Sequence, residues 1–167
     1  MARILIKYFI MFISLIIIQV LILNQVQFSG FANPYIYILF ILLLPFNAPQ
    51  YLVLLLAFLI GFSVDIFSNS LGIHSAASVF IAFIRPLVVR IISNKEEDRN
   101  EYPGLKQNKF RWFLYYTTIL VFVHHFILFY LEIFTFSNFL GTFSKIILSS
   151  VLSVFIIILS QFLIFRE

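Results

Sequence analysis

The sequence predicts an all-α, polytopic membrane protein, on the evidence of its composition, its repeated apolar stretches and its single long polar connection. Of its 167 residues, 62% are hydrophobic, 11% are charged and 23 are Phe, and the mean hydropathy is +1.07. Such values are incompatible with an ordinary soluble domain. Apolar stretches of about 20 residues, the length of helix that crosses a hydrocarbon core, recur along the chain. We therefore expect one transmembrane domain over residues 1–167, with six helices.

The first segment runs from about Ile4 to Leu23, with Arg3 before it and Lys7 near its start. Its apolar run is longer than the core of a secretory signal, and no small-x-small cleavage site follows. It is therefore predicted to be a membrane anchor that stays on the protein.

The second segment, Tyr35–Phe46, is short. About twelve helical residues rise roughly 18 Å, whereas the hydrocarbon core is about 30 Å thick. Pro34 can begin a helix, because the first turn needs no N–H, and Pro45 and Pro49 enclose a turn. The residues leave two alternatives open, a short span or a re-entrant hairpin.

Four longer segments complete the fold, at Tyr51–Phe67, Ile73–Ile92, Trp112–Phe134 and about Leu140–Phe165. Small residues recur in several of them at helical spacing, which predicts faces where helix backbones approach closely inside the bundle. These residues are Ala57 and Gly61 in the third segment, Ser75, Ser78 and Ala82 in the fourth, and Ser149, Ser153 and Ser160 in the sixth.

The distribution of basic residues predicts the topology. The connection at about residues 93–111 carries Lys95, Arg99, Lys106, Lys109 and Arg111, and the shorter loops carry no Lys or Arg. The positive-inside rule places this connection and the N-terminus in the cytoplasm. An even number of crossings must then separate them, so the second segment is expected to cross, and both termini are expected to be cytoplasmic. The net charge of +4 thus reflects topology and gives no reason to expect a nucleic-acid partner.

Charged side chains at membrane depth are costly and call for an explanation. Asp65 lies near the end of its segment, where it is either an interfacial, half-solvated acid or cap, or a contact for a partner. Arg85, followed by Pro86, is expected to snorkel to the inner surface, with an ion pair or a partner contact as the alternative. Glu132 and Lys145 flank the last hairpin and are expected to form an ion pair.

Enzymatic function is not expected. The chain has no Cys, no His-Glu-x-x-His zinc motif and no Gly-x-Ser-x-Gly nucleophile elbow. His124 and His125 point about 100° apart on a helix, and they are interpreted as neutral packing residues. His125 and Glu132 share a face but lie roughly 10 Å apart along the axis, too far for one metal ion. No catalytic, cofactor-binding or metal-binding residue is predicted.

The most informative motif joins the third and fourth segments and consists of Gly61, Asp65, Gly72, His74 and Ala77. This pattern, the length of the chain and its layout resemble the MreD family of rod shape-determining membrane proteins. The resemblance implies a non-enzymatic scaffold of the cell-elongation and peptidoglycan-synthesis machinery in the bacterial cytoplasmic membrane. It implies MreC as the main partner, with MreB, RodA and a class B penicillin-binding protein as further partners, and no cofactor. The motif residues would then serve in packing or in binding a partner.

The same resemblance raises an alternative, because the MreD family is similar to the six-helix substrate-binding subunits of energy-coupling-factor vitamin transporters. Those subunits typically carry an Ala-x-x-x-Ala docking motif on the first helix. Residues Ile4–Leu23 contain no Ala, which disfavours docking to such a transporter.

Overall fold

The computed structural model describes residues 2–25, 32–93, 101–133 and 139–164, and these are almost entirely helical. The elements are α1 (Ala2–Ile18), continued by the π-helical turn η1 (Gln19–Leu23), then α2 (Ile38–Leu43), α3 (Gln50–Ser68), α4 (Ile73–Ile92), α5 (Phe110–Ile133) and α6 (Phe139–Ile164). Within these ranges, five helices are long and apolar enough to cross a membrane. The chain is therefore an all-α, multi-pass membrane protein, as the sequence predicts.

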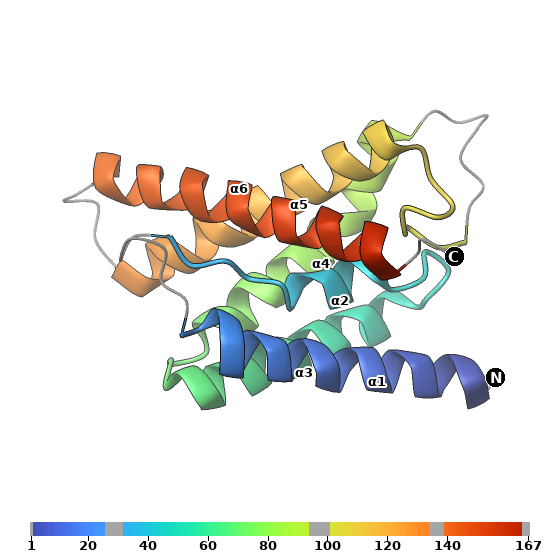
Figure 1. The fold of residues 1–167 in the computed structure, drawn as a ribbon, viewed down its shortest axis with the longest axis horizontal. Helices are drawn as coiled ribbons and strands as arrows, with labels where there is room; N and C mark the ends of the chain where they lie inside the picture. Colours follow the sequence, from blue (N-terminus) through green and yellow to red (C-terminus); the bar gives the residue numbers. More distant parts are fainter. Residues whose placement is uncertain (1, 26–31, 94–100, 134–138, 165–167) are drawn as a thin grey trace.

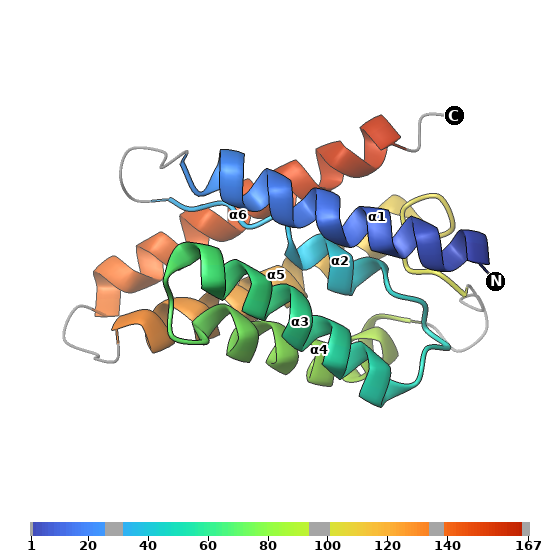
Figure 2. The same ribbon diagram turned by 90° about the horizontal axis from the view of Figure 1, so that it is seen from below.

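The long helices pack in the order of the chain. α3 packs on α4, α4 on α5, and α5 on α6, while α1 contacts α2 and α3. Figures 1 and 2 both show α3 and α4 running side by side, with the short α2 enclosed between the longer helices. The start of α1 and the end of α6 lie at the same end of the molecule, to the right in Figure 1. This arrangement agrees with an even number of passes.

The second segment runs from one end of the molecule to the other, as the short-span alternative expects, but its helix is shorter than predicted. Only Ile38–Leu43 is helical, and the residues from Asn33 to Ile36 have no regular secondary structure. In Figure 1 this part of the chain runs across the molecule, from the end where α1 stops to the end where α3 begins. It is therefore not a re-entrant hairpin. So short a helix suffices because the extended stretch before it covers much more distance per residue than a helix does.

Among the described residues, this passage through the bundle contains the longest unbroken run of buried side chains. Side chains from Tyr37 to Leu42 are fully or almost fully buried, and Leu44 is buried as well. A backbone that is not helical cannot face lipid, because its polar groups would find no partners there. The segment can therefore keep its irregular backbone only because it is buried among the long helices.

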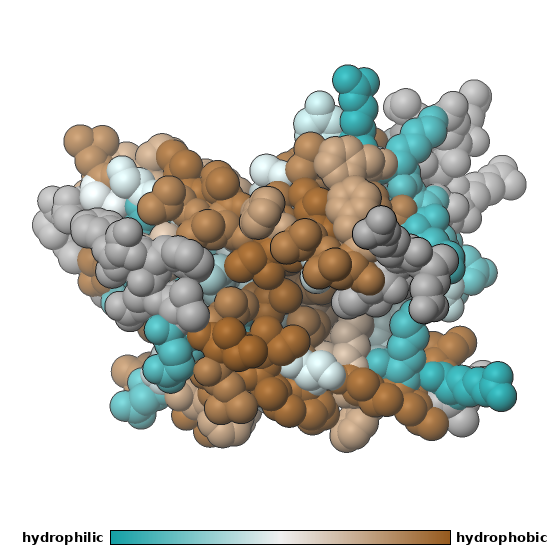
Figure 3. All heavy atoms as spheres, in the orientation of Figure 1, coloured by the Kyte–Doolittle hydropathy of each residue, from teal (hydrophilic) through white to brown (hydrophobic). Residues whose placement is uncertain are grey.

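The outer surface of the long helices is apolar. Large hydrophobic side chains are exposed along all five of them, and Figure 3 shows hydrophobic atoms over most of one face, with hydrophilic side chains gathered toward the ends. The distribution is the one expected of helices that face lipid or other membrane helices. Phe134 and Phe165, the last residues of the predicted fifth and sixth segments, lie outside the described residues.

Candidate functional site

The backbones of α3 and α4 approach each other closely at Gly61. A Cβ atom built on Gly61 would lie 2.6 Å from the Cα atom of Ser75 and 2.7 Å from the carbonyl oxygen of His74. Both atoms belong to the backbone and cannot move aside without shifting the helix. The small-residue spacing in the sequence thus marked a true helix contact, and only glycine fits there.

One turn further along α3, the carboxylate of Asp65 caps the first turn of α4. Its Oδ1 accepts hydrogen bonds from the Ser70 hydroxyl at 2.6 Å and from the His74 backbone N–H at 3.0 Å. Its Oδ2 accepts from the Ser75 N–H at 2.9 Å and from the Ser75 hydroxyl at 2.5 Å. N–H groups in the first turn of a helix have no partner within that helix, and a carboxylate is well suited to them.

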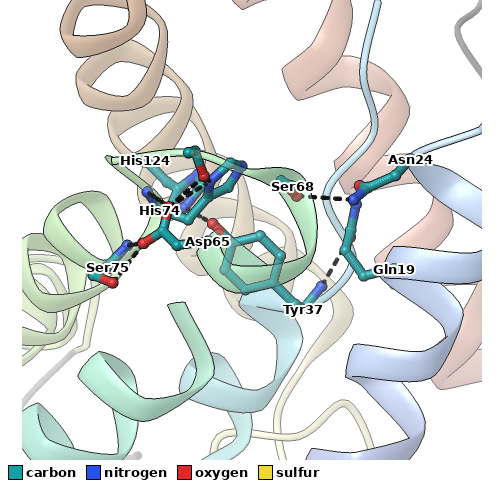
Figure 4. Close-up of polar contacts among 9 residues, drawn as sticks. Gln19, Asn24, Tyr37, Asp65, Ser68, His74, Ser75 and His124 are labelled. Carbon is teal, nitrogen blue, oxygen red and sulfur yellow. Dashed lines mark hydrogen bonds and ion pairs between the residues drawn. The ribbon is translucent and has the colours of Figure 1, made fainter. Parts of the chain in front are cut away.

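Figure 4 shows Asp65 between His74 and Ser75, with the ring of Tyr37 nearby. The Nδ1 atom of His74 lies 3.0 Å from Asp65 Oδ1, and Asp65 is only 3% exposed. Of the alternatives that the sequence left open, capping matches these contacts and a half-solvated acid does not. Both carboxylate oxygens are already occupied by neighbours in the chain.

The turn between α3 and α4 uses left-handed backbone at two residues. Asn69 has φ 52° and Gly72 has φ +81°. Residues with a side chain rarely adopt the backbone conformation of Gly72, so this position favours glycine. The space around it is open, since a Cβ atom there would have no neighbour within 4 Å. Ala77, the last residue of the motif, is fully buried on α4. The structure thus brings Gly61, Asp65, Gly72 and His74 into one helix-helix joint, which we call the α3–α4 joint.

Aromatic and imidazole rings surround Tyr35 beside this joint. The Tyr35 ring centroid lies 5.5 Å from that of His74, 6.1 Å from that of His124 and 5.3 Å from that of His125. The two adjacent histidines of α5 therefore meet the same tyrosine, although they point in different directions. The hydroxyl of Tyr37 lies 2.6 Å from His124 Nε2, and His125 Nε2 lies 3.1 Å from the Ser153 hydroxyl. Both histidines act as buried hydrogen-bonding residues here.

Side chains from other helices bond the backbone N–H groups of the second segment. Gln19 Oε1 accepts from Ile36 at 2.8 Å, and Ser153 accepts from Tyr35 at 2.8 Å. Ser149 accepts from Asn33 at 3.1 Å. Figure 4 also shows Gln19 bonded to Asn24, which in turn reaches Ser68 on α3. Two serines of the sixth-helix stripe, Ser149 and Ser153, therefore serve the extended segment. Ser153 also contacts His125 of α5, and Ser160 bonds the carbonyl of Ile157 in its own helix.

The carbonyl groups at the other end of α2 are bonded in the same way. The hydroxyl of Tyr116 donates to Leu42 at 3.0 Å, and that of Tyr8 donates to Leu43 at 3.2 Å. The guanidinium of Arg85 donates to the carbonyl of Leu44. Its Nε also donates to Tyr116 at 2.7 Å.

The expectation that Arg85 snorkels is wrong, because its side chain is 4% exposed and turned inward. Its charge also lies 5.3 Å from the ring centroid of Phe46. A cation at the C-terminal end of a helix is stabilised by the helix dipole and by the unpaired carbonyls there. α2 ends in the interior instead of at the membrane surface, and this gave Arg85 a partner that sequence reasoning did not foresee.

The last hairpin brings Glu132 and Lys145 together. Lys145 Nζ lies 3.3 Å from Glu132 Oε2, and the two side chains are 23% and 47% exposed respectively. Lys145 Nζ also lies 4.3 Å from the ring centroid of Phe129. Glu132 also lines one cavity with Ser70 and His74, beside the α3–α4 joint.

Sequence reasoning missed Gln19, Tyr37 and Tyr116 as contributors to the interior. Each is a polar or hydroxyl-bearing side chain inside an apolar segment, and this was the available signal. A comparison of this chain with protein-family models, with curated proteins and with solved structures found no match.

Proposed function

We propose that the chain is a non-enzymatic scaffold of the MreD type in the bacterial cytoplasmic membrane. In this proposal it binds MreC and, through MreC or directly, MreB, RodA and a class B penicillin-binding protein. The supporting observation is that four of the residues that carry the resemblance, Gly61, Asp65, Gly72 and His74, form a single joint between α3 and α4. The fifth, Ala77, is buried on α4. Such a joint fixes two neighbouring membrane helices at one spacing and gives a partner a rigid surface.

The partner would meet the outward face of α3 rather than the motif itself. Asp65 is buried and bonded within the chain. On the other side of the same helix, the apolar side chains of Leu55, Phe58, Phe62 and Ile66 are exposed and follow one another at steps of three and four residues. The rings of Phe58 and Phe62 stack with their centroids 5.6 Å apart. In a membrane, close packing of such surfaces drives association between helices.

The experiment is copurification of MreC from solubilised native membranes. Phe58→Ala combined with Phe62→Ala should leave the protein inserted and abundant while it removes most of the bound MreC. The matched control is Phe155→Ala combined with Phe162→Ala, because these two rings are similarly exposed but lie on α6. Depletion of the wild-type protein should give wide or rounded cells.

Asp65→Leu tests the role of the α3–α4 joint separately from that of the exposed apolar face of α3. Since it removes the cap of α4, it should lower both the amount of folded protein and the recovery of MreC. Equal MreC recovery with all variants, or normal cell shape after depletion, would overturn the proposal.

A vitamin-binding subunit is the alternative function, and one cavity favours it. This cavity of about 350 Å³ is lined by polar groups that include Asn24, Tyr35, Ser70, His74 and Glu132. Its size falls in the range of small-molecule sites, about 300–1,000 Å³. Mass spectrometry of the purified protein decides between the two functions: a retained vitamin together with copurified energising subunits would support the transporter, and MreC without either would support the scaffold.

A further inference from the structure

We propose that a cavity between α1, α2 and α6 binds an anionic glycerophospholipid, with an acyl chain along α1 and the headgroup at the end where α1 begins. The cavity has a volume of about 440 Å³. It is distinct from the α3–α4 joint and from the polar cavity beside Glu132.

The wall of the cavity suits an acyl chain. Met11 and Leu15 of α1 and Leu39 and Leu43 of α2 line it, and the two elements pack on each other. Figure 1 shows α1 and α6 on either side of α2, and Figure 3 shows hydrophobic atoms over the same face. Because these helices are long enough to span a bilayer, lipids reach this face from the side.

A buried amide gives the cavity a polar group at depth. Gln161 of α6 lines it and is 0% exposed. Its amide nitrogen and oxygen have no hydrogen-bond partner among the residues that the structure describes. An unbonded amide in an apolar setting is costly, so a ligand that bonds it gains affinity. The ester carbonyls and glycerol oxygens of a phospholipid supply such partners, whereas a plain hydrocarbon does not.

Positive charge lies at one end of the cavity. Lys7 of α1 and Lys106 of the connection between α4 and α5 both line it, and both are exposed. Gly104, beside Lys106, comes close to Gln161: a Cβ built on it would lie 3.7 Å from the Gln161 Oε1 atom. Gln161 and the two lysines therefore line the same cavity. Basic pockets between membrane helices are typical sites for anionic headgroups.

The test measures lipid retention by native mass spectrometry on the detergent-purified full chain. Phosphatidylglycerol and phosphatidylcholine with identical acyl chains are added at equal concentration, and inorganic phosphate is added separately. Wild-type protein should retain one phosphatidylglycerol in clear preference to phosphatidylcholine. Inorganic phosphate should not compete with it, because the acyl chain is part of the recognised group.

Lys7→Gln combined with Lys106→Gln should weaken phosphatidylglycerol binding by about fivefold for each lysine and leave phosphatidylcholine binding unchanged. The matched control is Arg90→Gln combined with Arg111→Gln, which removes two exposed charges that do not line the cavity. Gln161→Leu should reduce retention of both lipids, since it removes the amide and leaves the lysines. Equal retention of the two lipids by wild-type protein would overturn the proposal, and so would an equal loss of phosphatidylglycerol binding in the control double variant. If Gln161→Leu does not fold, the lysine variants still test the proposal.

Discussion

Two glycines show how differently the same residue type is used in this chain. At Gly61 a Cβ would meet backbone atoms at 2.6–2.8 Å, whereas at Gly104 it would meet only side-chain atoms, at 3.6 and 3.7 Å. The first is a clash with a neighbouring helix, and the second is ordinary van der Waals contact. The spacing of small residues predicts a close approach at Gly61 and none at Gly104, and the structure shows which atoms face each glycine.

We expect Gly61→Ala to destabilise the protein by about 1–3 kcal/mol, the usual cost of overpacking a tight contact. Thermal unfolding in detergent, followed by the loss of helical circular dichroism, measures the change. Gly104→Ala is the control and should leave the unfolding temperature almost unchanged. Equal effects of the two substitutions would contradict the close approach of α3 and α4.

The ion pair of Glu132 and Lys145 is a second interaction between individual residues that can be tested. Because both side chains are partly exposed, the pair should contribute only about 0–1 kcal/mol. Reversing either charge alone should lower the unfolding temperature slightly. Glu132→Lys combined with Lys145→Glu should restore it, and a double variant as impaired as the sum of the single ones would show that the two charges do not interact.

At the scale of elements, the second segment depends on its neighbours for its hydrogen bonds. A six-residue helix leaves most of its end groups unpaired, and the bilayer core supplies no water to bond them. Gln19 of η1 and Ser153 of α6 bond the N–H groups. Tyr8 of α1, Tyr116 of α5 and Arg85 of α4 bond the carbonyl groups. One irregular segment thereby ties four of the long membrane-spanning segments together.

Gln19→Leu should loosen this segment, because it leaves the N–H groups of Ile36 and Tyr37 without their acceptor. An unpaired buried donor costs about 1–3 kcal/mol. Hydrogen–deuterium exchange should become faster for a peptide that covers residues 35–43. Ser14→Ala is the control, since its hydroxyl only bonds a carbonyl of its own helix, and unchanged exchange in Gln19→Leu would show that the segment holds its shape without the amide.

At the scale of the whole molecule, the turn after α3 and the connection before α5 should lie on opposite sides of the membrane. Leu71, at the turn, is 99% exposed, and Glu101, in the connection, is also exposed. Because the chain has no native Cys, Leu71→Cys and Glu101→Cys each give a single label site. An impermeant maleimide added to intact cells should label Leu71→Cys and should not label Glu101→Cys. Labelling at position 101 would contradict the proposed topology.

The sequence by itself determined the fold class, the five long helices and the place where two of them meet. These depend on composition, on apolar length and on the spacing of Gly61 and Asp65. In a bilayer, such local properties determine directly which segments span the membrane and where helices pack. The proximity of Glu132 and Lys145 followed in the same way from a short hairpin.

Only the tertiary structure decided the course of the second segment and the role of Arg85. Residues 33–36 keep an irregular backbone because side chains on η1 and α6 accept their N–H groups. The α6 partners lie more than a hundred residues away, and no local pattern encodes them. Arg85 is turned inward because α2 ends beside it. In a bilayer every buried polar group must find its partner within the protein, so the position of each one is set by the assembled bundle.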